Sequence, residues 1–201
     1  MIKRFIFGVD QFSKTVGHAF AWCIVILTFG TSYEVFVRYV LNNPTSWAFD
    51  FSYLMYGALF FMAGAYTLSR GGHVRADIFY RLWPTRVQAS LELALYILFF
   101  FPGITALVYS GWGYGFDSMR ILEVSVNSPA GVPIWPLKML IPFGAALLAV
   151  QGFAEVLRCI VCLREGRWLR RLHDVEELET AIQHGLEDKE RTEEALKGML
   201  K

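Results

Sequence analysis

Long apolar runs separated by short polar segments form the main pattern along this chain. Residues 15–33, 51–69 and 93–116 contain no Asp, Glu, Lys or Arg, and a shorter uncharged run, 139–154, has apolar flanks. A helix rises about 1.5 Å per residue and needs about 20 residues to cross about 30 Å of hydrocarbon. Because backbone polar groups in lipid must be satisfied internally, each run is expected to span as a helix.

The pattern therefore predicts an all-α integral membrane protein with four antiparallel transmembrane helices. The expected spans are about 18–41, 47–69, 90–116 and 135–162, which together make a transmembrane domain over 18–162. Residues 1–17 carry apolar positions at helical spacing among charged ones, which predicts an interfacial amphipathic helix; a cytoplasmic extension of the first span is the alternative. Residues 163–201 are expected to form a basic and then acidic cytoplasmic tail with an amphipathic helix.

Basic residues predict the orientation of these helices. The N-terminal segment, the second connection and the segment after the fourth helix are rich in Lys and Arg, whereas the first connection has none and the third has one. The positive-inside rule therefore places both termini and the second connection in the cytoplasm.

Composition supports a membrane class and adds a charge asymmetry. The 201 residues are 55% hydrophobic, above the usual 45–50% of soluble domains, and the net charge is only +1. Residues 1–172 hold fifteen Lys and Arg against nine Asp and Glu, whereas residues 173–201 hold four against nine. A basic apolar body thus carries an acidic tail.

Three charged residues lie close to the first connection. Glu34 and Arg38 are four residues apart on one helical face, and Asp50 lies about one turn after the connection, at similar depth in an antiparallel hairpin. We expect a structural polar cluster of Arg38 with Asp50, Glu34 or both, which would join the first two helices; outward snorkelling of Arg38 is the alternative. Trp47 and Trp135 lie beside connections and suit interfacial anchors.

Two further motifs contain residue types that occur in catalytic or metal sites. In SRGGHVRADIFYRL, His73, Arg75 and Asp77 follow the second helix on the cytoplasmic side, and a solvated loop is the plain interpretation. No second histidine or cysteine lies nearby to complete a catalytic or metal site. Cys159 and Cys162 form CIVC, but a zinc site would need two more ligands, so two small apolar residues on one helix are favoured.

Small residues recur on the predicted spans. Gly57 and Gly64 lie seven residues apart, and Gly111 and Gly115 lie four apart. Both spacings allow close contact between helices. Pro102 is expected to bend the third helix.

Three of these stretches also resemble a known family. They are RYVLNNPTSWAFDF, GAYTLSRGGHVRADIFY and SPAGVPIWPLKMLIP. In this order they resemble the small integral-membrane (DctQ-like) subunit of TRAP transporters, the tripartite ATP-independent periplasmic family. The likeness spans about residues 18–162. Phe49 departs from the pattern, because an acidic residue often precedes the one at Asp50, and the acidic tail is an addition.

The resemblance implies a function without chemistry in this chain. It implies a static scaffold for a large, elevator-type (M-type) membrane subunit, in ion-driven, usually sodium-driven, uptake of an organic acid. A periplasmic substrate-binding (P-type) protein and the phospholipid bilayer of a bacterial or archaeal inner membrane are the other implied partners. It implies no enzyme activity, cofactor, metal or nucleic acid. The residues that match the family's motifs, assigned to structure and subunit contact, are Arg38, Trp47, Asp50, His73, Arg75 and Asp77.

Three other classes remained as alternatives. A membrane anchor of a respiratory haem or quinone enzyme would need histidines inside the bundle. A four-helix thiol oxidoreductase would need a dithiol near the oxidising face. A self-sufficient small exporter would carry flux alone.

Overall fold

The computed structural model describes residues 1–72, 80 and 83–169 of the chain. Its principal elements are the helices α1 (Ile2–Tyr39), α2 (Ala48–Ser69), α4 (Thr85–Leu95), α5 (Phe101–Arg120) and α6 (Trp135–Glu165), with a π-helical turn at Tyr96–Phe100. Within the described ranges, four continuous helical stretches are long and apolar enough to cross a membrane. They are α1, α2, the α4–α5 stretch Thr85–Arg120, and α6. The predicted all-α class with four membrane-length helices is therefore confirmed.

The first helix is longer than the first predicted span. α1 runs for 38 residues without a break, so residues 1–17 continue the span and correspond to the alternative left open from the sequence. Their buried positions, Ile6, Asp10, Ser13 and Gly17, recur every three or four residues. This face packs against the rest of the bundle, which explains why the helix does not turn away at residue 17.

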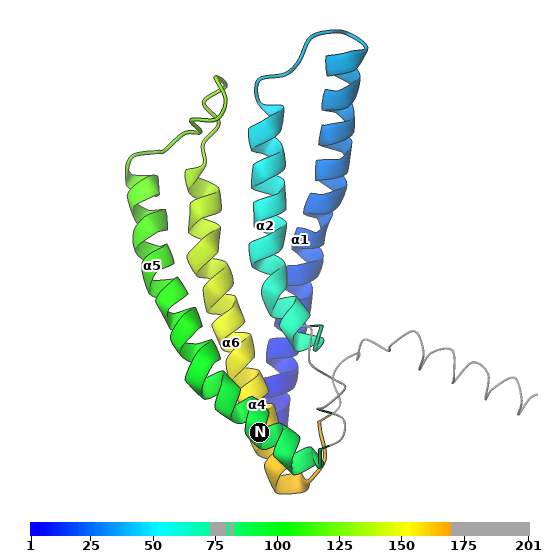
Figure 1. Ribbon diagram of the computed structural model, residues 1–201, viewed down its shortest axis with the longest axis vertical. Helices are drawn as coiled ribbons and strands as arrows, with labels where there is room; N and C mark the ends of the chain where they lie inside the picture. Colours follow the sequence, from blue (N-terminus) through cyan, green and yellow to red (C-terminus); the bar gives the residue numbers. More distant parts are fainter. Residues whose placement is uncertain (73–79, 81–82, 170–201) are drawn as a thin grey trace, which may run out of the picture.

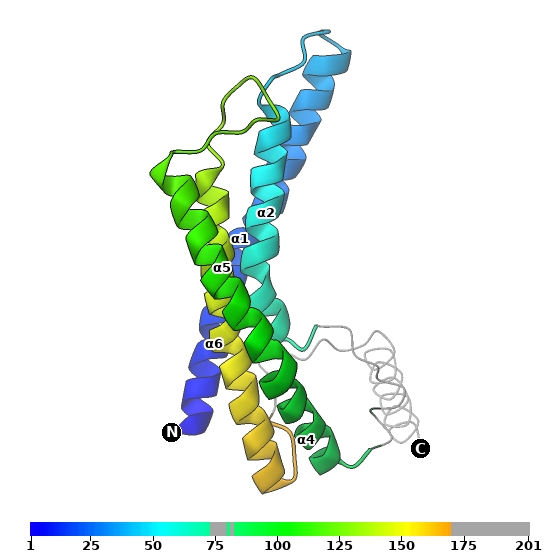
Figure 2. The ribbon, with the colours of Figure 1, turned by 60° about the vertical axis from the view of Figure 1, so that its left-hand side comes forward.

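The helices form two antiparallel hairpins. Figure 1 shows α1 beside α2 and α5 beside α6, with the two hairpins close together at the end that holds the N-terminus. Toward the connecting loops the hairpins diverge, in the view of Figure 1 and in the turned view of Figure 2. The central contact is between α2 and α6, and α1 also packs against α6.

Glycines let the central helices approach closely. A Cβ added at Gly144 of α6 would lie 2.6 Å from the backbone oxygen of Phe61 of α2, and one at Gly57 would lie 2.7 Å from a methyl group of Leu137. Between α5 and α6, a Cβ at Gly115 would lie 3.0 Å from the backbone oxygen of Lys138. At Gly144 and Gly115 the neighbouring atom is backbone, so a larger residue at either position would not permit this approach.

The third span changes its helical pitch once. Pro102 has no N–H, so the carbonyl of Leu98 loses the donor that an α-helix would supply. The π-helical turn at Tyr96–Phe100 lies immediately before this proline, and the N–H of Phe101 donates to the carbonyl of Tyr96. The local change in hydrogen bonding thus joins α4 and α5 into one continuous span.

The contact at Gly144 gives a direct test of the α2–α6 packing. We expect Gly144→Ala to lower the free energy of unfolding by about 1–3 kcal/mol, because the new methyl group meets backbone rather than a movable side chain. Thermal unfolding in detergent would measure the change.

Gly113→Ala on α5 is the matched control, since a Cβ there would meet nothing within 4 Å. It should leave stability unchanged or raise it by up to about 1 kcal/mol through helix propensity. Equal effects of the two variants would contradict the packing argument.

Candidate functional site: polar clusters at both ends of the bundle

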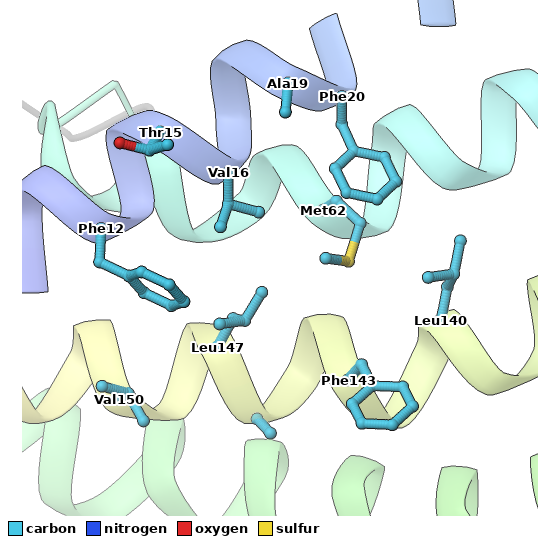
Figure 3. A pocket seen from close by; sticks show the side chains of 11 residues that line it. Phe12, Thr15, Val16, Ala19, Phe20, Met62, Leu140, Phe143, Leu147 and Val150 are labelled. Carbon is cyan, nitrogen blue, oxygen red and sulfur yellow. The ribbon is translucent and has the colours of Figure 1, made fainter.

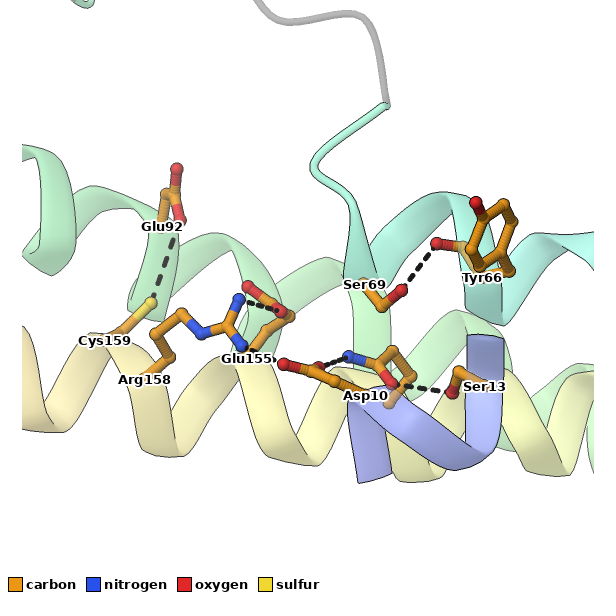
Figure 4. Close-up of polar contacts among 9 residues, drawn as sticks. Asp10, Ser13, Tyr66, Ser69, Glu92, Glu155, Arg158 and Cys159 are labelled. Carbon is orange, nitrogen blue, oxygen red and sulfur yellow. Dashed lines mark hydrogen bonds and ion pairs between the residues drawn. The ribbon is translucent and has the colours of Figure 1, made fainter. Parts of the chain in front are cut away.

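The largest fully buried side chain among the described residues, that of Arg158, lies between α1 and α6. Arg158 of α6 is 1% exposed, and its Nη2 donates to Asp10 Oδ2 of α1 at 2.5 Å. Its Nη1 lies 3.0 Å from Glu155 Oε1, one turn earlier on α6. Figure 4 shows Asp10 and Ser13 of α1 beside Glu155 and Arg158.

Gln151 extends this group toward the middle of the bundle. Its amide Nε2 donates to Asp10 Oδ1 at 2.8 Å, and its Oε1 accepts from Ser13 Oγ at 2.7 Å. Ser13 and Asp10 are each 3% exposed, and Gln151 is fully buried. We call these five residues the Arg158 cluster: Asp10, Ser13, Gln151, Glu155 and Arg158.

The Arg158 cluster acts as a fixed electrostatic contact between two helices. Moving charges out of water costs several kcal/mol per ion, and the cost is offset only where the partners are close and well hydrogen-bonded. Here each oxygen of Asp10 accepts a hydrogen bond from α6. The arrangement therefore fixes the rotation and height of α1 relative to α6.

The cysteines of CIVC lie beside this cluster. Cys159 and Cys162 are both fully buried and both are free thiols. Cys159 Sγ lies 3.8 Å from Glu92 Oε2 of α4, and the other oxygen of Glu92 accepts from Tyr80 Oη at 2.6 Å. Among the residues that the structure describes, no group of three His, Cys, Asp or Glu side chains lies close enough together to hold a metal ion.

A second polar group lies where the α5–α6 connection meets the start of α2. Asp50 is 1% exposed, and its Oδ1 accepts from Ser125 Oγ at 2.6 Å while its Oδ2 accepts from Ser128 Oγ. We call these three residues the Asp50 cluster. The carboxylate also lies in the first turn of α2, where the helix dipole favours a negative charge. Figure 2 shows the connection reaching the start of α2.

The connection itself is ordered by its own hydrogen bonds. Ser125 N donates to Val132 O at 2.8 Å, and Ile134 N donates to Glu123 O at 3.0 Å. Lys138 Nζ of α6 donates to Glu123 Oε2 at 2.6 Å, which lowers the pKa of the Glu123 carboxyl below its usual value. The loop is thus a folded element that ties α6 to α2.

The structure divides the polar cluster expected from the sequence into two groups. Arg38 donates to Glu34 Oε1 from Nε at 2.9 Å and from Nη2 at 2.6 Å, and Glu34 Oε2 accepts from the backbone N and the hydroxyl of Thr45. Asp50 takes its partners from the α5–α6 connection instead. Of the expected partners of Arg38, Glu34 is therefore found and Asp50 is not.

The two tryptophans expected to be interfacial anchors, Trp47 and Trp135, lie at helix starts. Trp47 stacks on Tyr33 with ring centroids 6.4 Å apart and meets Phe51 edge-on at 5.7 Å. Trp135 is the first residue of α6. The expected subunit-contact residues His73, Arg75 and Asp77 lie outside the described residues.

Sequence reasoning missed the Arg158 cluster as a unit. Asp10 lies in the segment predicted to be an interfacial amphipathic helix, and Gln151 lies in the uncharged run 139–154. The available signal was Glu155 and Arg158, two opposite charges one helical turn apart inside an apolar helix. Nothing in the sequence marks Ser125 and Ser128 as partners of Asp50, since serine is common in polar loops.

Together these observations define a class of protein: an all-helical membrane subunit whose buried polar side chains hold its own helices together. The chain matches, over residues 27–162, the family described as Tripartite ATP-independent periplasmic transporters, DctQ component, and it belongs to that family. It is thus a small-subunit component of a transporter, as the resemblance implied. A comparison with curated proteins found no match. The family match gives no support to a respiratory anchor.

Removing Arg158 should be among the most damaging single changes in the bundle. We expect Arg158→Met to lower the free energy of unfolding by about 3–5 kcal/mol, because it leaves the Asp10 and Glu155 carboxylates buried without their cation. Denaturant titration in detergent would measure this.

Arg164→Met provides the control, because Arg164 is an exposed arginine on the same helix. Its effect should stay within about 0.5 kcal/mol. A loss for Arg158→Met as small as that of the control would contradict the proposed contact between α1 and α6.

The Asp50 cluster makes a separate prediction about the α5–α6 connection. Asp50→Ala removes the acceptor of two serine hydroxyls, and a hydrogen bond to a charged group contributes about 1.5–3 kcal/mol. We expect amide hydrogen exchange in residues 122–134 to become at least about ten-fold faster, which corresponds to about 1.4 kcal/mol.

Asp117→Ala is the control for this change, since Asp117 is an exposed acidic residue in the last turn of α5, next to the α5–α6 connection. It should leave exchange in the connection unchanged. Unchanged exchange after Asp50→Ala would mean that the connection is held by its internal hydrogen bonds alone.

Proposed function

We propose that the chain is the static scaffold subunit of a TRAP transporter. In this proposal it supports a large, elevator-type membrane subunit in the inner membrane. That subunit takes up an organic acid, delivered by a periplasmic binding protein, with an ion gradient that is usually sodium. This chain contacts no substrate. Membership of the DctQ family supports the general role, and the distribution of polar groups supports the passive one.

The observation that carries the proposal is that the polar groups of the bundle are turned toward one another. The Arg158 cluster and the Asp50 cluster join different helices at the two ends. Between them, the close contacts of α2 and α6 involve glycines, phenylalanine and leucine. A transport route needs polar groups near the midplane, whereas these contacts favour a rigid body.

The proposed orientation follows from the basic residues. The Arg158 cluster and the N-terminus lie at one end of the bundle, which we assign to the cytoplasm by the positive-inside rule. The Asp50 cluster and both hairpin loops then face the periplasm. His73, Arg75 and Asp77 would contact the large subunit on the cytoplasmic side.

Reconstitution tests the role directly. Liposomes that contain this chain alone should give no substrate flux under an inward sodium gradient. Liposomes with the large subunit, this chain and the binding protein should give flux, and omitting this chain should abolish or strongly reduce it. Flux carried by this chain alone would overturn the proposal.

A cross-link tests whether the scaffold is static. Gly57→Cys with Leu137→Cys, in a Cys23→Ser background, allows a short, reducible thiol cross-linker to join α2 to α6, because a Cβ at position 57 would lie 2.7 Å from Leu137 Cδ1 and Leu137→Cys removes that methyl group. Transport by the assembled system should persist after cross-linking. The two single-cysteine variants serve as controls for labelling, and a loss of flux that reduction restores would mean that the hairpins move.

A further inference from the structure

An apolar groove runs between α1 and α6 with α2 as its floor. Its volume is about 490 Å³. Figure 3 shows Phe12, Val16 and Phe20 of α1 facing Leu147 and Phe143 of α6 across it. The one lining residue with a polar side chain is Thr15, and its hydroxyl donates to Gln11 O within α1 at 3.0 Å. The groove therefore offers its occupant apolar contact alone.

The groove face of α1 continues toward the N-terminus and ends at a cation. Arg4, Gly8, Phe12, Thr15 and Ala19 follow one another at intervals of three or four residues, so they share one face of the helix. A Cβ added at Gly8 would meet nothing within 4 Å, so the surface between Arg4 and the groove is open. A molecule could lie along this face from Arg4 to the groove without an obstacle.

The charges at this end favour an anionic headgroup. The carboxylates of Asp10 and Glu155 are buried and face Arg158, while Lys3 Nζ contacts Glu165 at 2.6 Å. Arg4 is exposed and makes no ion pair with a described residue. Arg164, in the last turn of α6, is also exposed at this end, and so is Arg167, which lies just after the helix and pairs with Glu165. The outward-facing surface is thus positive.

We propose that this face binds one anionic phospholipid, with an acyl chain in the groove and the phosphate at Arg4. From Arg4 to Val16, at the centre of the groove face of α1, the helix rises about 18 Å. Half of a hydrocarbon core is about 15 Å thick, so a lipid whose headgroup lies at Arg4 places its acyl chain at the groove. Anionic lipids are the natural partners of basic side chains at a cytoplasmic surface.

The size of the groove distinguishes between two possible occupants, a lipid and a helix of another subunit. Three turns of helix, about 16 Å long and about 10 Å across, occupy about 1,200 Å³. The groove offers about 490 Å³ and is open on one side, so a single acyl chain can lie within it, whereas the body of a helix would have to lie across its opening. This inference does not depend on the scaffold function, because it concerns the isolated chain in a bilayer.

Native mass spectrometry of the full-length chain tests the proposal. The protein would be released from nanodiscs that contain equal amounts of phosphatidylglycerol and phosphatidylcholine with the same acyl chains. We expect one retained phosphatidylglycerol per chain, with at least a five-fold preference over phosphatidylcholine. Ala19→Trp, which fills the groove, and Arg4→Gln, which removes the cation, should each reduce the retained fraction at least five-fold.

Two matched variants control for size and charge. Ala106→Trp adds the same side chain at an exposed position on α5, outside the groove, and Arg120→Gln removes an exposed cation at the opposite end of the bundle. Both should retain lipid as the unchanged chain does. Because Arg4 is exposed, Arg4→Gln remains informative even where Ala19→Trp disturbs folding.

Other results of these experiments would contradict the proposal. Equal retention of the two lipids, or retention that Arg4→Gln leaves unchanged, would overturn the proposal. A photo-reactive phenylalanine analogue at Phe20, in the complex with the large subunit, should cross-link to lipid; cross-linking to the large subunit instead would show that a protein segment fills the groove.

Discussion

The ion pair between Arg158 and Asp10 constrains the position of α1 more strongly than any apolar contact in the bundle. Apolar side chains can slide past one another in lipid at little cost, because lipid tails are as apolar as the helices. A buried charged side chain cannot slide at little cost, since any displacement leaves it without its partner in a medium of low polarity. With both ions almost fully enclosed, the first helix has one rotation and one height relative to α6.

The rest of the architecture follows from combining that contact with two others. Glycines at positions 57 and 144 bring α2 against α6 in the middle of the bundle, and Asp50 fixes the α5–α6 connection to the start of α2. Three kinds of interaction thus act at three heights. Each joins one hairpin to the other, so relative motion of the hairpins would have to break polar contacts at both ends and packing between them.

The number and type of the spans could be predicted from the sequence because they depend on local information. An uncharged run long enough to cross a bilayer has few alternatives to a helix, and the structure has a helix at each run. The pairing of Glu34 with Arg38 was also within reach, since four residues on a helix bring two side chains together. The continuity of α1 through residue 17 could not be predicted, because an amphipathic segment fits both an interfacial helix and an extension of the first span.

The partners of Asp50 and Asp10 could not be predicted, because they lie far away in the sequence. Ser125 and Ser128 are 75 and 78 residues from Asp50, and Arg158 is 148 residues from Asp10. Periodicity identifies which face of a helix is polar but not which other helix it meets. The prediction for Asp50 chose the nearest opposite charge in its own hairpin, whereas two neutral hydroxyls of the other hairpin satisfy the carboxylate.

The inward orientation of the charged side chains also determines which contacts the outer surface of the helices can make. Because the carboxylates of Asp10, Glu155 and Asp50 are occupied within the bundle, most large side chains on the outer surface of the spans are apolar or aromatic. Such a surface adheres to lipid or to a neighbouring membrane protein through packing alone, without directional bonds that would oppose sliding. If the chain is the static scaffold that we propose, a body that does not deform is the property that this role requires.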